Sequence, residues 1–205
     1  MPLPGYSDQV RRQTRIQLDQ FRSLQSKWEE LSNDGLTSVT AAVNTGLEIG
    51  YSDLPTHWPP ALLAFHDLKE RYVRKLTVQV YDHLQALDHI LFRLSQIHQK
   101  LTTVVETLDR LLDSTSSTVS SDASKTTDPP IFRVAGLRYL VNFTHDLLAM
   151  YQRDLKWRQE TLTVIPQLTS RSSGVALLSA WLNSVELDKG RLLDFKDLLE
   201  FELDL

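Results

Sequence analysis

The chain has 205 residues, of which 22 are basic and 26 acidic, and it contains no cysteine. A net charge of −4 provides no overall positive field for phosphates, so we expect no direct nucleic-acid ligand. The lack of cysteine excludes disulfides, thiolate nucleophiles and Cys-rich zinc sites, and it suits a reducing compartment. No apolar run approaches the roughly 18 residues of a membrane span. These features predict a soluble intracellular protein, nuclear or cytoplasmic.

The first helical pattern begins after the cap candidate Ser7. Its apolar face carries Phe21, Leu24, Trp28 and Leu31. Asn33-Asp34-Gly35 interrupts this face, and the apolar row resumes out of phase at Leu36, so we expect a kink or a rotated second segment near residues 33–35. The proline-rich segment 51–60 predicts a loop that leads into the next helix.

The second helical pattern contains the most regular apolar row of the chain, with alternating steps of four and three residues. The row consists of Val80, Leu84, Leu87, Leu91, Leu94, His98, Leu101, Val105, Leu108 and Leu112. This spacing is typical of a coiled-coil seam. A second row, Ile90, Ile97, Val104 and Leu111, widens the stripe. So wide a stripe needs more than one partner helix, from this chain or from another protein.

A segment rich in Ser and Thr follows the second helix, which we expect to end near Asp113. Between residues 114 and 128, ten of fifteen residues are Ser or Thr, which predicts a disordered linker. The linker acts either as a plain spacer or as a phosphorylated tether. We therefore divide the chain into long N-terminal helices (1–113), a linker (114–130) and a C-terminal helical segment (131–205).

The C-terminal segment contains three further helical patterns. The first carries Val141, Thr144, Leu148, Tyr151, Leu155, Arg158, Leu162 and Ile165, and stops before Pro166. One short amphipathic pattern surrounds Trp181, and another follows the cap candidate Asp188. The predicted fold class is all-α, an elongated helical hairpin or bundle with long coiled-coil-like helices.

Residues for catalysis, cofactor binding or metal binding form no recognisable pattern. The sequence has no glycine-rich phosphate loop and no H-E-x-x-H, G-x-S-x-G or calcium-loop motif. His83 and His89 are six residues apart, unlike the four-residue spacing of a helical metal pair. His98 lies in the apolar row, where it either fixes the register or packs with one hydrogen bond. We therefore predict a non-enzyme with no catalytic residue, no cofactor and no metal.

Two charged segments admit a docking interpretation and a structural one. The run 67–75 could bind an acidic partner, but Asp67 with Arg71 and Glu70 with Arg74 are also helical pairs that solvate a face. The acidic end from 194 to 204 is interpreted as a solvated helix surface.

Three sequence blocks are similar to signatures of one known family. They are Lys27-Trp28-Glu29-Glu30-Leu31 with Gly35-Leu36-Thr37, then Pro129-Pro130-Ile131-Phe132 leading into the residues from His145 to Leu155, then Leu178-Ser179-Ala180-Trp181-Leu182. Their order and spacing resemble the cyclin-dependent kinase 2-interacting protein family. The stretch from Phe65 to Lys75 also resembles the family's companion, the ribosome-maturation subunit of an Afg-type AAA ATPase assembly. The sequence is therefore compatible with one subunit, with the other, or with a divergent relative of both.

The resemblance implies a helical adaptor that pairs with a homologous helical subunit and with an AAA ATPase. The family acts in large ribosomal subunit maturation and in protein turnover linked to chromatin and replication. An alternative is a regulator that binds cyclin-dependent or checkpoint kinases in the cell cycle and the DNA damage response.

The partner-binding residues that we predict come from the apolar row and from the signature aromatics. They are Leu87, Leu91, Leu94, Leu101, Val105 and Leu108 for helix pairing, with Trp28, Tyr151 and Trp181 as anchors or as core.

Overall fold

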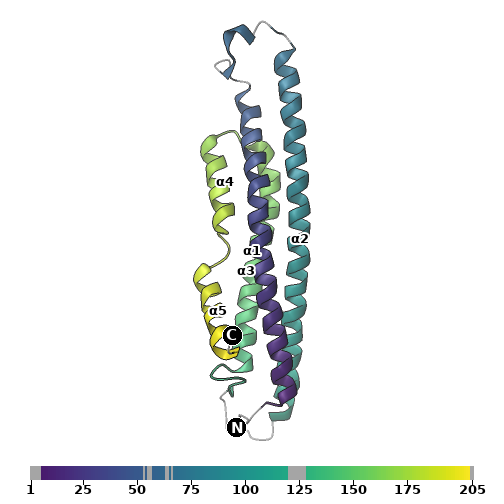
Figure 1. The fold of residues 1–205 in the computed structure, drawn as a ribbon, viewed down its shortest axis with the longest axis vertical. Coiled ribbons are helices and arrows are strands. Elements are labelled where there is room, and N and C mark those ends of the chain that lie inside the picture. The colour runs from purple at the N-terminus through teal and green to yellow at the C-terminus, as the bar shows by residue number, and fades with distance from the viewer. Residues whose placement is uncertain are drawn as a thin grey trace. The chain divides into compact units, whose positions relative to one another are not determined.

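The structure, a computed structural model, describes residues 6–52, 54, 57–62, 65, 67–119 and 128–203, without the side chains of residues 116–119. The helices are α1 (Asp8–Tyr51), α2 (Leu68–Val119), α3 (Leu137–Val164), α4 (Arg171–Asn183) and α5 (Lys189–Leu203), and the 3-10 turns are η2 (Pro60–Leu62) and η3 (Ile165–Gln167) (Figure 1). No strand occurs among the described residues, so the predicted all-α class is confirmed. None of the helices in these ranges combines the length and apolarity needed to cross a membrane.

The expected interruption of the first helix was wrong, because α1 continues through residues 33–35 without a break. Ser32 and Gly35 are buried and connect the buried position Leu31 to the buried position Val39. The apolar row of α1 changes phase only if the small residues Ser32 and Gly35 are left out of it. Small residues at the interface keep the helix period, so the buried stripe is continuous.

Helix α2 differs from its expected bounds at both ends. It begins at Leu68, after the separate turn η2, rather than at the prolines. It ends at Val119, so the first six residues of the expected disordered linker are helical. The hydroxyls of Ser114 and Thr115 donate to the carbonyls of Leu111 and Leu112, which lets these polar residues continue the helix. Residues 120–127 of that linker lie outside the described residues.

The predicted helix caps are confirmed. The Ser7 hydroxyl accepts a hydrogen bond from the backbone N–H of Val10 at 3.3 Å, at the start of α1. The Asp188 carboxylate accepts from Gly190 and Arg191 at the start of α5. Each cap satisfies backbone donors that have no partner within the first turn of a helix.

The described helices contribute to two compact units that do not follow the chain order. Unit 1 comprises residues 1–28, 96–153 and 186–205, and unit 2 comprises residues 29–95 and 154–185. Each unit therefore contains a part of α1, α2 and α3, with α5 in unit 1 and α4 in unit 2.

The core of unit 1 joins α5 to α1 and α3 through aromatic rings. The ring of Phe195 on α5 makes edge contacts with Phe21 on α1 and Phe143 on α3, at centroid distances of 5.5 and 5.3 Å. Edge-to-face geometry of this kind adds to the burial of the rings. These contacts fix the apolar face of α5 that its sequence pattern predicts.

In unit 2, a glycine lets α4 approach α1 closely. A Cβ atom on Gly174 would lie 2.9 Å from Cγ1 of Val43 and 3.1 Å from Cδ1 of Leu47. Real Cβ atoms essentially never come as near as the 2.9 Å to Val43, so a larger residue would require α4 or its neighbours on α1 to shift. The predicted helix around Trp181 is confirmed, with its start set by the Ser170 hydroxyl, which accepts from Ser173 N–H.

Candidate functional site

The six aliphatic residues that we predicted for partner pairing are all buried within the chain. Leu87, Leu91 and Leu94 belong to the core of unit 2, and Leu101, Val105 and Leu108 belong to the core of unit 1. The same chain therefore covers this face of α2. A partner that binds the folded chain has to contact other surfaces.

The three signature aromatics are also core residues, which is one of the two roles expected for them. In unit 1, the rings of Trp28 and Tyr151 meet edge to face with 5.0 Å between centroids. In unit 2, the indole N–H of Trp181 donates to the carbonyl of Ser32 at 3.2 Å. Residues from the first and second sequence blocks thus touch in unit 1, and a residue of the third block reaches the first helix in unit 2.

Gly35 explains why α1 carries a glycine in the middle of a long helix. A Cβ atom at this position would lie only 2.8 Å from Cζ2 of Trp181. The indole ring therefore packs directly on the α1 backbone. The glycine that seemed to break the helix instead makes room for the aromatic landmark of the third block.

A buried ion pair lies beside Trp181 in unit 2. Nε of Arg158 donates to Oδ2 of Asp154 at 2.7 Å, and both side chains are fully buried. The guanidinium also donates to the Ser184 hydroxyl at 2.9 Å and stacks on Trp181 with 4.5 Å from Cζ to the ring centroid. Nη1 of Arg158 is buried and makes no hydrogen bond to any described residue. This cluster attaches the end of α4 to α3.

The sequence contained a signal for this pair that we did not use. Arg158 stands in the apolar row of the third helical pattern, and Asp154 precedes it by four residues. Opposite charges at that spacing on a buried face indicate a pair that shields both groups from an apolar environment.

A second buried charge holds α5 to the loop before α3 in unit 1. The carboxylate of Glu202 accepts backbone N–H bonds from Arg133, Val134 and Ala135, with shortest distances of 2.8, 3.1 and 2.8 Å. Glu202 is buried, so the interpretation of the acidic end as a fully solvated surface was wrong at this residue. Three amide donors replace the water that a carboxylate loses on burial.

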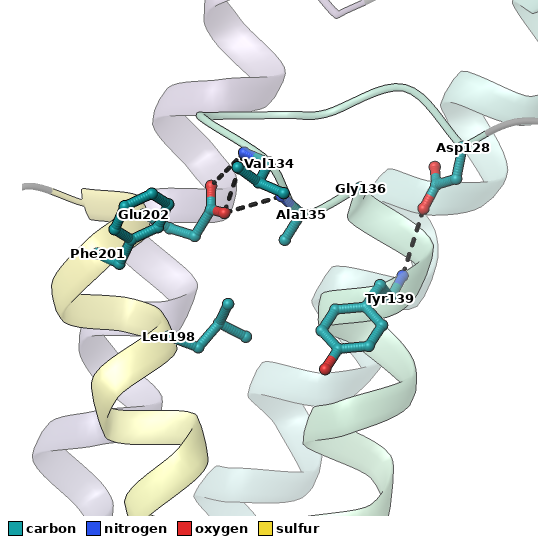
Figure 2. A pocket seen from close by; sticks show the side chains of 8 residues that line it. All are labelled: Asp128, Val134, Ala135, Gly136, Tyr139, Leu198, Phe201 and Glu202. Carbon is teal, nitrogen blue, oxygen red and sulfur yellow. Dashed lines mark hydrogen bonds between the residues drawn. The ribbon is translucent and has the colours of Figure 1, made fainter.

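An open hollow of about 560 Å³ lies next to Glu202 (Figure 2). Its walls are formed by Asp128, Val134, Ala135, Gly136, Tyr139, Leu198, Phe201 and Glu202. The carboxylate of Asp128 accepts from Tyr139 N–H at 3.3 Å and from the Tyr6 hydroxyl at 3.1 Å. Burial and the charge of Asp128 raise the pKa of Tyr6 to about 12. Both carboxylates thus bind groups of the chain itself, and we assign the hollow a structural role.

His98 lies half-buried on α2 in unit 1, and its Nε2 makes no hydrogen bond to any described residue. Burial lowers the pKa of this imidazole. Among the residues that the structure describes, no group of three or more His, Cys, Asp or Glu side chains could hold a metal ion.

The charged run 67–75 forms the two pairs that its spacing predicts. Arg71 lies 3.7 Å from Asp67 and Arg74 lies 3.9 Å from Glu70, and all four side chains are about four-fifths exposed. Such pairs contribute little to stability, as expected for a solvated face.

No protein-family model matches the chain, and no curated protein is significantly similar to it. The resemblance to a known family therefore rests on the three sequence blocks alone.

Proposed function

We propose that the chain is a non-catalytic helical adaptor subunit of an Afg-type AAA ATPase assembly. The supporting observation is that residues of the three family-like sequence blocks pack against residues of another block. Trp28 of the first block packs on Tyr151 of the second, and Trp181 of the third packs on Gly35 of the first. Blocks whose residues pack against one another have a physical reason to occur together in a sequence.

In this role the chain binds a homologous helical subunit and the ATPase, and the ATPase performs the chemistry. The buried aliphatic row gives α1, α2 and α3 a packed interior, so the adaptor offers its outer faces to partners. The assembly would act in large ribosomal subunit maturation and in protein turnover linked to chromatin and replication.

Affinity purification of the tagged full chain from native extract tests this proposal. We expect an AAA ATPase and a second helical subunit to be recovered in stoichiometric amounts. A cyclin–kinase pair in their place would support the kinase-regulator alternative and overturn the ATPase proposal. Recovery of neither would overturn both.

One double variant makes the purification more specific. Asp67→Ala combined with Arg71→Ala removes an exposed ion pair and should leave recovery of the ATPase unchanged. Loss of the ATPase with this variant, at unchanged helical content, would identify the charged run as the docking site.

A further inference from the structure

The outer side of α2 in unit 2 carries large apolar side chains that no described residue of the chain covers. Val78, Tyr81 and Phe92 are 56, 68 and 61% exposed. On a surface helix, positions opposite the core are normally polar. Two aromatic rings there expose much apolar area, which marks a candidate interaction surface.

These residues belong to a further coiled-coil row on the same helix, which lies on the side opposite the buried aliphatic row. The row is Val78, Tyr81, Gln85, Asp88 and Phe92, in steps of three and four, and all five residues are exposed. With 100° per residue, Gln85 points roughly 160° away from the core residue Leu87. We name these five residues the outer row.

We propose that a second copy of this chain binds antiparallel along the outer row. In an antiparallel helix pair, residues lie opposite each other when their numbers add to a constant. If Tyr81 lies opposite Phe92 of the second copy, Gln85 lies opposite Asp88 and Val78 opposite Ser95. A twofold axis relates the two copies, so each of these contacts occurs twice. The same face of the same helix therefore forms both sides of the interface.

The polar residues of the outer row select this partner and this direction. Gln85 donates its amide N–H to the Asp88 carboxylate of the second copy. An aliphatic partner helix would instead bury these polar groups without a hydrogen-bond partner. At the flank, Asp82 comes within one turn of His89 of the second copy, so an imidazole N–H meets a carboxylate. A parallel pair would instead place Asp88 against Asp88, and like charges repel.

The length of the outer row limits the size of the interface. From Val78 to Phe92 the helix covers roughly 21 Å at 1.5 Å per residue. A helix pair of that length lies at the small end of specific interfaces, so the dimer should form in the micromolar range. This dimer does not depend on the ATPase assembly, and its presence or absence is independent of the purification result.

Sedimentation velocity of the full chain over the micromolar range is the first test. We expect a concentration-dependent monomer–dimer equilibrium for the wild type, and a monomer at every concentration for Tyr81→Lys combined with Phe92→Lys. The matched control, Val175→Lys with Leu182→Lys, adds the same charge to residues of α4 that are 54 and 58% exposed and should still dimerise. Circular dichroism should show wild-type helicity in both variants. A wild type that stays monomeric, or a dimer that survives the Tyr81/Phe92 change, overturns the proposal.

Cysteine cross-linking tests the direction, because the natural chain contains no cysteine. A chain with both Val78→Cys and Ser95→Cys should form an intermolecular disulfide on mild oxidation. The single variants should not, because in the antiparallel pair the two copies of one position lie roughly 25 Å apart along the helix. Cross-linking of the single variants would show a parallel pair and overturn the proposal.

Discussion

The two short helices, α4 in unit 2 and α5 in unit 1, are attached in similar ways but with different compensation of charge. Each is fixed by one buried aromatic ring, Trp181 or Phe195, and by one buried charged side chain, Arg158 or Glu202. Arg158 is neutralised by the carboxylate of Asp154, whereas Glu202 is held by three backbone amides. Amide donors carry no net charge and remain after every side-chain substitution except one to proline. The attachment of α4 should therefore be more sensitive to the loss of a single partner than that of α5.

The largest effect is expected when the carboxylate is removed from the α4 attachment. Asp154→Ala leaves the guanidinium of Arg158 buried without a counter-charge, which costs about 3–5 kcal/mol of unfolding free energy. Urea unfolding measures the loss. Replacing both partners, Asp154→Leu with Arg158→Met, should recover much of it, because an apolar pair needs no compensation. A double variant that is less stable than the single one would contradict this explanation.

Removal of the carboxylate from the α5 attachment should cost less. Glu202→Ala leaves three amide donors without their acceptor, and we expect a loss of about 2 kcal/mol, because part of this loop is accessible to water. Glu200→Ala is the neighbouring control, since it removes only part-exposed pairs with Arg22 and Lys196 and should change stability by about 0.5 kcal/mol or less. Equal effects of the two substitutions would mean that the amide contacts of Glu202 do not hold α5.

The contact between Trp181 and α1 can be probed by adding one methyl group. Gly35→Ala places Cβ against the indole ring, and the resulting overpacking of about 1–3 kcal/mol should exceed the gain of about 1 kcal/mol in helix propensity. Gly50→Ala provides a control of opposite sign. Its nearest neighbour, the carbonyl of Leu168, would lie at an ordinary 3.9 Å, so the thermal midpoint should rise. A stabilising Gly35→Ala would contradict the close packing of Trp181.

The smallest expected effect is the pH dependence due to His98. Burial lowers its pKa in the folded chain, so the unfolded chain binds more protons as the pH falls. Its contribution to stability is complete above the unfolded pKa of about 6.5 and is lost progressively below that pH. The urea midpoint should therefore decrease on acidification by less in His98→Leu than in the wild type. Identical shifts in the two proteins would show that His98 does not carry this dependence.

The sequence indicated the helices and their apolar faces well, because periodicity follows directly from helix geometry. Leu87 and Leu101 were correctly placed on one stripe of α2, and the caps Ser7 and Asp188 were correctly located. Periodicity does not specify which helix covers a stripe. For that reason the sequence alone left open whether this row faces the chain's own helices or another protein.

The buried charges and the glycine contact were harder to predict, because they depend on residues that are distant in the sequence. Glu202 resembles its solvated acidic neighbours until the loop with Val134 is placed beside it. Gly35 reads as a helix breaker until Trp181 is known to pack on it. Short-range rules weigh the residue type, whereas these positions are decided by tertiary contacts.

The most direct measurement is circular dichroism of the isolated wild-type chain and of the Leu94→Asp variant, both without any partner. The wild type should be highly helical and unfold in a cooperative thermal transition, because its own helices cover the aliphatic row. A buried, unpaired carboxylate costs several kcal/mol, so the variant should lose most of its helicity at temperatures where the wild type is folded. A variant that melts like the wild type and loses only the binding of a partner would contradict this expectation. It would mean that the aliphatic row forms an interface with another protein.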